Sequence, residues 1–96
     1  MDSFDEWVSS NGAQWWKFGN NPVLRGVFKE RRMELSYTKD KDVPTYYLEV
    51  DGNPVKFQSQ HRRLGSMMKR LEEGQGVTIE RSGSGQETEY KVEIGG

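Results

Sequence analysis

Apolar and polar residues alternate with a period of two along four segments of the chain, which is the pattern of strands with one buried face. These segments are residues 45–50, 55–58, 77–80 and 89–94. The turn formers Asp51-Gly52-Asn53-Pro54 separate the first two segments, and the glycine- and serine-rich loop at 82–85 separates the last two. Each pair of segments therefore predicts a β-hairpin.

A longer strand is predicted ahead of the hairpins, over residues 23–34. Gly26 interrupts this strand, and a glycine inside a strand is typical of a bend or bulge in a strongly curved sheet. The polar stretch at 35–44 ends in a proline and predicts an exposed loop.

The period changes to that of a helix after the second hairpin strand. Leu64, Met67, Met68 and Leu71 follow the spacing i, i+3, i+4 and i+7, which places them on one face of a helix. We expect this helix over residues 61–74, with its apolar face in the core.

A shorter helix is predicted at the start of the sequence. Ser3 and Glu6 have the spacing of a capping box, which marks the beginning of a helix. Phe4 and Trp7 then share one helical face, and Asn11-Gly12 ends the helix. We expect the two rings to dock this helix either on the rest of the chain or on a second copy of it.

Aromatic side chains must supply much of the core. The chain has 96 residues, of which 32% are apolar, and this is enough for one domain. Three Trp, four Tyr and four Phe accompany only 15 Val, Ile and Leu. We expect a helix and an aromatic extension over residues 1–22 and a folded domain over residues 23–96. Because neighbouring side chains in an extended segment point to opposite sides, one of Trp15 and Trp16 is expected in the core and the other at its rim.

The order of the elements, three strands, one helix and two strands, predicts a mainly β fold. A five-stranded sheet with one covering helix hides its inner face best by curling into a small Greek-key barrel. The helix then lies between the third and fourth strands of the barrel. The alternative is an α+β fold, in which an open antiparallel sheet carries the helix across one face.

This order resembles that of the oligonucleotide/oligosaccharide-binding (OB) fold, and the resemblance covers residues 15–95. Two stretches are also similar to small phage and archaeal-virus OB proteins of the single-stranded-DNA-binding type. They are WKFGNNPVLRGVF at residues 16–28 and LEEGQGVTI at residues 71–79. The resemblance implies a viral or microbial origin and a ligand platform on the outer surface of the first three strands.

The net charge of −1 conceals an uneven distribution of charges. Residues 1–22 sum to −2, residues 25–70 to +5 and residues 71–96 to −4. The total charge therefore does not exclude a nucleic-acid partner, because the middle of the chain is cationic.

Residue types give little support to catalysis or metal binding. The chain has no cysteine and one histidine, His61, which we expect in a loop or as a helix cap. We therefore expect a protein that is not an enzyme and that holds no cofactor and no metal. The acidic start lacks the layout of a signal peptide, and no apolar run reaches the length of a membrane span, so we expect a cytoplasmic (intracellular) protein without membrane contact.

Binding of a single strand needs exposed rings for the bases and cations for the phosphates. If Leu48 faces the core, Tyr47 points outward beside Lys56 of the next strand. On the first strand, Arg25, Lys29 and Arg31 share one alternation. By resemblance to OB proteins, Tyr37, Lys39 and Lys41 would flank this face on one side and Arg81 on the other.

We therefore expect weak to moderate binding of single-stranded DNA or RNA with little sequence preference. The predicted site is the aromatic and cationic face of the first three strands. The alternative is a protein-interaction or self-assembly module that uses the aromatic N-terminal segment, and formation of a homodimer would be its sign.

Overall fold

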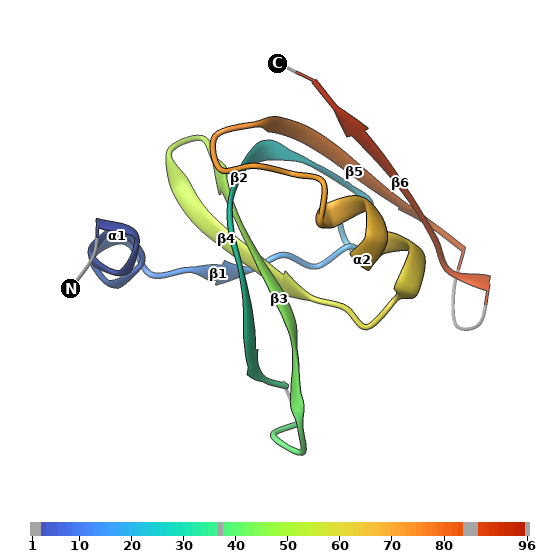
Figure 1. Ribbon diagram of the computed structural model, residues 1–96, viewed down its shortest axis with the longest axis horizontal. Coiled ribbons are helices and arrows are strands. Elements are labelled where there is room, and N and C mark those ends of the chain that lie inside the picture. The colour runs from blue at the N-terminus through green and yellow to red at the C-terminus, as the bar shows by residue number, and fades with distance from the viewer. Residues whose placement is uncertain (1–2, 37, 84–86, 96) are drawn as a thin grey trace.

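In the part of the chain that the computed structural model describes, six strands form one mixed sheet, accompanied by two helices (Figure 1). The structure describes residues 3–36, 38–83 and 87–95. In chain order the elements are α1 (Ser3–Asn11), β1 (Gln14–Trp15), β2 (Val23–Leu35), β3 (Asp42–Val50), β4 (Asn53–Gln58), α2 (Arg62–Met68), β5 (Gly76–Ser82) and β6 (Glu89–Ile94). The predicted mainly β class is confirmed.

The strands follow the order β1-β4-β3-β2-β5-β6, and every neighbouring pair is antiparallel except the parallel pair β1 and β4. The predicted closure into a barrel is wrong, because within the described ranges the sheet contains no pairing between β4 and β6. The N-terminal extension takes the edge of β4 that such closure would use. The backbone N–H of Trp16 donates to the carbonyl oxygen of Lys56 at 2.8 Å, next to the short strand β1, which the sequence did not predict.

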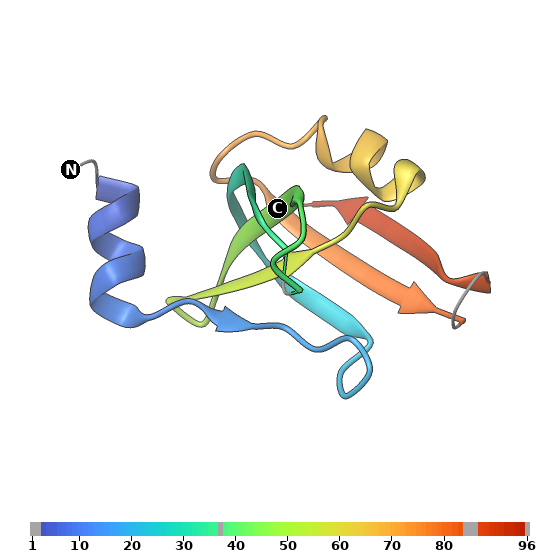
Figure 2. The ribbon, with the colours of Figure 1, turned by 90° about the horizontal axis from the view of Figure 1, so that it is seen from below.

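The sheet curls so that β4 and β6 approach each other across one aromatic side chain. The ring of Phe18 lies 5.2 Å from that of Phe57 on β4 and 5.8 Å from that of Tyr90 on β6, with edge-on geometry in both pairs. We call this junction the seam. Helix α2 packs against β6 and lies over the side of the sheet formed by β5 and β6 (Figure 2).

The core fills the inside of this curled sheet. Its buried residues come from the inner faces of β2 to β5, from Phe18 and from α2 with the turn that follows it. They are Phe18, Leu24, Phe28, Tyr46, Leu48, Val55, Phe57, Leu64, Met68, Leu71, Val77 and Ile79. The aromatic contribution expected from composition is therefore present, with four rings among the buried residues and Trp16 and Tyr90 packed against them.

A β-bulge in β2 changes which side chains share a face. Phe28 lies opposite Leu48, but Glu30, two residues later, lies opposite Tyr47, one residue back along β3. The predicted irregularity therefore falls in the same strand, between Phe28 and Glu30 rather than at Gly26. Side chains alternate along a strand, so one extra residue exchanges the two faces for every position beyond it.

Local signals located most of the remaining elements. The two-residue turn at Asp51 and Gly52 has φ values of 52° and 83°, the positive values that suit a tight β3–β4 hairpin. Helix α1 ends as predicted, with the N–H of Gly12 donating to the carbonyl of Val8 at 2.8 Å. The largest errors in the predicted boundaries are that α2 ends at Met68 rather than at Gly74 and that β3 begins at Asp42 rather than at Thr45. The predicted loop at 82–85 lies partly outside the described residues.

Neither of the two helices in the described ranges has the apolar length that a membrane span requires.

Candidate nucleic-acid interface

The predicted binding face lies beneath helix α1. We call it the Tyr47 face and define it as the outer side of β2, β3 and β4 around Tyr47. Tyr47 lies outside the core cluster, yet it is only 4% exposed, and the Phe4 ring packs on it in a T-shaped arrangement with centroids 5.2 Å apart. The expectation of an exposed stacking ring is therefore wrong for this conformation. The docking expected of the N-terminal helix takes place on its own chain.

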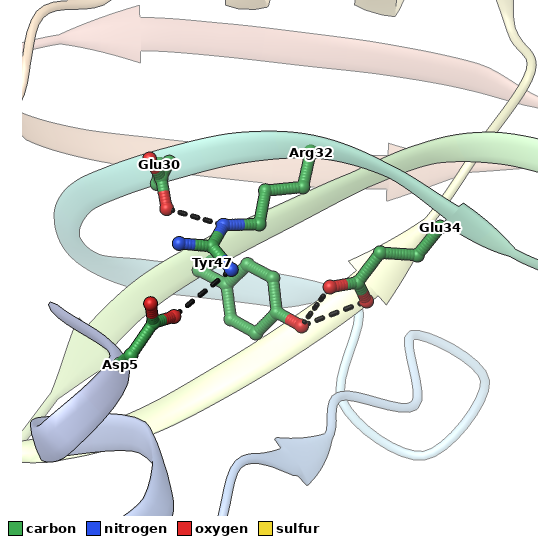
Figure 3. Close-up of polar contacts among 5 residues, drawn as sticks. All are labelled: Asp5, Glu30, Arg32, Glu34 and Tyr47. Atoms are coloured by element: carbon green, nitrogen blue, oxygen red, sulfur yellow. Dashed lines mark hydrogen bonds and ion pairs between the residues drawn. The ribbon is translucent and has the colours of Figure 1, made fainter. Parts of the chain in front are cut away.

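The hydroxyl of Tyr47 is held by a carboxylate. It donates to Glu34, whose two carboxylate oxygens both lie 2.7 Å from it (Figure 3). Burial of the ring, followed by the hydrogen bond and the negative charge of Glu34, raises the pKa of Tyr47. At neutral pH the side chain is therefore an uncharged donor whose position is fixed.

The raised pKa of Tyr47 predicts a loss of stability at alkaline pH. An unfolded tyrosine loses its proton near pH 10.0, whereas folded Tyr47 keeps it to higher pH. Below pH 10 Tyr47 is protonated in both the folded and the unfolded state, so its contribution to stability is constant. Above pH 10 the unfolded state loses the proton first, and the free energy of unfolding should fall by about 1.4 kcal/mol per pH unit until the pKa of folded Tyr47 is reached. Urea unfolding of wild type and Tyr47→Phe between pH 8 and pH 11 measures this. If both lose stability in parallel, Tyr47 is not the group responsible.

Carboxylates form ion pairs with two cations of the Tyr47 face, Lys29 and Arg32. The ammonium group of Lys29 lies 3.1 Å from a carboxylate oxygen of Glu49. Arg32 lies between two acids, with 2.6 Å from its Nε to Glu30 and 3.0 Å from a terminal nitrogen to Asp5 of α1 (Figure 3). The hydrogen bond that Arg32 donates to Glu30 is the main cause of the raised pKa of Arg32. The face is therefore an ion-paired network rather than a uniformly cationic surface.

The structure brings only part of the predicted site together. Lys29 and Lys56 accompany Tyr47, with the ammonium group of Lys56 lying 5.9 Å from the tyrosine ring centroid. The prediction that Arg31 shares their face is wrong, because the bulge places it opposite Tyr46, on the inner side of the sheet. Arg32 takes the expected place instead, and no local sequence signal marks the bulge that puts it there.

The remaining predicted residues lie elsewhere. Arg25 is exposed on β2 opposite Thr78 of β5. Lys39 and Lys41 are exposed near the tip of the β2–β3 hairpin, which projects from the rest of the molecule (Figure 1). Tyr37 lies outside the described residues. Arg81 is at the end of β5, on the other side of the seam.

A groove follows the seam between the β1–β4 edge and the β5–β6 hairpin, and we call it the seam groove. Phe18, Phe57 and Gln58 belong to its floor and walls. The side chains that define its chemistry are three further aromatic residues and two cations, Trp15, Trp16, Tyr90, Lys17 and Arg81. No carboxylate lines the groove within the described part of the chain, in contrast to the Tyr47 face.

The rings of the seam groove differ in exposure, as predicted for adjacent tryptophans. Trp15 is 42% exposed, while Trp16 packs against the core and donates from its indole nitrogen to the carbonyl of Asn21 at 3.2 Å. The ammonium group of Lys56 lies 4.7 Å from the Trp15 ring centroid, so a third cation stands at the rim. Nε of Arg81 is buried and has no hydrogen-bond partner among the described residues.

Searches against protein families, curated proteins and solved structures found no match for this chain. The function is therefore inferred from the chemistry of the seam groove and of the Tyr47 face. Sequence reasoning missed the groove because its residues come from positions 15–19, 57, 58, 81 and 90, which only the fold brings together.

His61 caps helix α2, and a helix cap is one of the two roles that the sequence predicts for it. Its Nδ1 accepts from the backbone N–H of Leu64 at 3.4 Å, so Nε2 carries the proton and donates to the carbonyl of Thr88 at 3.2 Å. The ring thus joins α2 to the segment that leads into β6. Across residues 3–36, 38–83 and 87–95, no group of three or more His, Asp or Glu side chains is arranged to bind a metal ion.

Proposed function

We propose that this protein binds single-stranded DNA or RNA in the seam groove, without catalysis and with little sequence preference. The observation that carries the proposal is the lining of the groove, which combines aromatic rings with cations and includes no carboxylate among the described residues. The resemblance of the sequence to OB-fold proteins supports the same class of ligand.

Each part of the groove has a role in such a complex. Bases would stack on Trp15 and Tyr90, and because every base has a π-face this contact is tolerant of sequence. Arg81 and Lys17 would neutralise phosphates, with Lys56 at the rim. A duplex keeps its bases stacked on one another, so rings in a groove select a single strand.

The small number of cations sets the expected strength of binding. With about three phosphate contacts on a single strand, the logarithm of the binding constant should fall with the logarithm of salt concentration at a slope of about −2. Binding should therefore be weak to moderate and strongest at low salt.

Removal of one ring or one cation from the groove tests the proposal. Trp15→Ala should weaken binding of labelled oligo-dT about 10-fold in fluorescence anisotropy, because one stacked base contributes roughly 1–3 kcal/mol. Trp15→Phe, which keeps a ring, should recover most of the affinity. Arg81→Gln should weaken binding and reduce the salt slope by about 0.7.

Arg70→Gln is the matched control, since it removes the same charge from an exposed position outside the groove. Equal losses for Arg81→Gln and Arg70→Gln would show that only net charge matters and would remove the groove as the site. Absence of any anisotropy change for wild type at low salt and tens of micromolar protein would overturn the function itself.

Self-assembly through the N-terminal segment is the other candidate function. In the structure the rings of that segment are engaged within the chain, Phe4 with Tyr47 and Trp7 with the ammonium group of Lys29 at 5.6 Å. A partner that binds these rings would have to replace these contacts. A concentration-dependent dimer in sedimentation, lost in Phe4→Ala, would favour assembly instead.

A further inference from the structure

Helix α1 lies on the outside of the sheet. None of its residues is buried, and the helix stands at one edge of the molecule (Figures 1 and 2). Phe4, Asp5 and Trp7 make the contacts to the Tyr47 face. Only Gly12, at φ 69°, and Ala13 separate α1 from β1, so the helix can swing away while β1 stays paired.

The groups that α1 covers are those that a single strand would use. Tyr47 offers a ring, and Lys29 and Arg32 offer cations, each of which also has an ion pair with an acid of the sheet, Glu49 and Glu30 respectively. Towards them α1 presents an aromatic ring and a carboxylate. The Phe4 ring packs on Tyr47 with the Arg32 guanidinium 4.6 Å from its centroid, and Asp5 forms an ion pair with Arg32 at 3.0 Å. A base and a phosphate would present the same pair of chemistries.

Lys56 connects the covered face to the open groove. Its ammonium group lies 4.7 Å from the centroid of Trp15 and 5.9 Å from the centroid of Tyr47. A strand that leaves the groove past Trp15 therefore meets a cation shared with the Tyr47 face. Its next bases and phosphates would reach the positions of Phe4 and Asp5.

We propose that α1 is an internal competitor of single-stranded nucleic acid, which covers the Tyr47 face in the free protein and is displaced by a strand that extends from the seam groove. This inference rests on the proposed function. While α1 is docked, the Tyr47 face contributes nothing to the affinity for a strand. The contribution of this face is therefore available only in the fraction of molecules in which α1 is undocked, and the apparent affinity for a long strand is lower in proportion.

Weakening of α1 docking in the full-length chain tests the inference. The double variant Phe4→Ala/Asp5→Asn removes the ring and the ion pair, and Glu6→Gln is the control, because it changes the charge equally at an exposed position of the same helix. For oligo-dT of about 15 nucleotides, the double variant should bind about 5-fold more tightly than Glu6→Gln. For oligo-dT of about 5 nucleotides, which fills only the groove, the two should bind equally.

Two further measurements identify the surface that is uncovered. Tyr47→Leu added to the double variant should abolish the 5-fold gain, because the gained contact is with that ring. Addition of the longer oligonucleotide to wild type should also accelerate amide hydrogen exchange in α1, since the displaced helix loses its packing.

The outcomes separate this inference from the proposed function. Equal affinities of the double variant and Glu6→Gln, with Trp15→Ala still impaired, would overturn the competitor role and leave the groove in place. Weaker binding by the double variant would show that α1 belongs to the binding surface and would also overturn it. Binding by the double variant that is insensitive to Trp15→Ala would remove the groove as the site, and the competitor role would fall with it, because that role requires a strand that extends from the groove. If no variant binds either oligonucleotide, both proposals fall.

Discussion

Replacement of Phe18 by alanine is expected to lower the free energy of unfolding by about 3 to 5 kcal/mol. Phe18 is 8% exposed, and its ring packs edge-on against Phe57 of β4 and Tyr90 of β6. No backbone hydrogen bonds join these two strands across the described part of the seam. The ring therefore supplies packing that strand pairing would supply in a closed barrel, and its loss leaves a cavity where the two ends of the sheet meet.

Urea unfolding of three variants isolates the role of this ring. Phe18→Leu keeps most of the volume and should cost less than about 1.5 kcal/mol. Trp15→Ala, at the rim of the same groove, should cost less than Phe18→Ala, because Trp15 is 42% exposed whereas Phe18 is 8% exposed. A loss below 1 kcal/mol for Phe18→Ala would mean that the seam is held by other contacts, such as those of α2.

The parts of the fold that were predictable depend on neighbours in the sequence. Asp51-Gly52 specifies its hairpin because both residues adopt positive φ at low cost, and the flanking alternation sets which side chains are buried. The stripe of Leu64 and Met68 specifies the buried side of α2 in the same way. Such signals lie within a few residues of the structure that they determine.

The candidate site was less predictable because it depends on long-range placement. One extra residue between Phe28 and Glu30 moves Arg31 away from Tyr47 and brings Arg32 towards it, and no residue type there requires a bulge. The pairing of Phe4 with Tyr47 joins positions that are far apart in the chain. The amphipathic pattern of α1 predicts that the helix packs on another surface, but it does not indicate which surface.

Gly26→Ala is expected to destabilise the protein by about 3 kcal/mol, through a clash rather than through lost contacts. Gly26 lies in β2 between β3 and β5, opposite Val77. A Cβ built at this position would collide with the backbone carbonyl oxygen of Glu49 and come within 3.0 Å of a methyl group of Val50. A side chain could rotate away, but the Glu49 carbonyl belongs to the neighbouring strand. β2 and β3 would have to separate in the middle of the sheet.

Two other glycines allow a steric clash to be distinguished from backbone strain as the cause of the destabilisation. Gly19→Ala adds a methyl group where no atom lies within 4 Å and φ is not positive, so it should change stability by less than about 0.5 kcal/mol. Gly52→Ala has the same open space but a φ of 83°, and its backbone strain should cost about 1 to 2 kcal/mol. If close strand packing dominates, chemical denaturation should show the largest loss of stability for Gly26→Ala, a smaller loss for Gly52→Ala and the smallest for Gly19→Ala. A smaller loss at Gly26 than at Gly52 would contradict it, because β2 could then accept a side chain beside Glu49 and the glycine would serve the curvature of the strand alone.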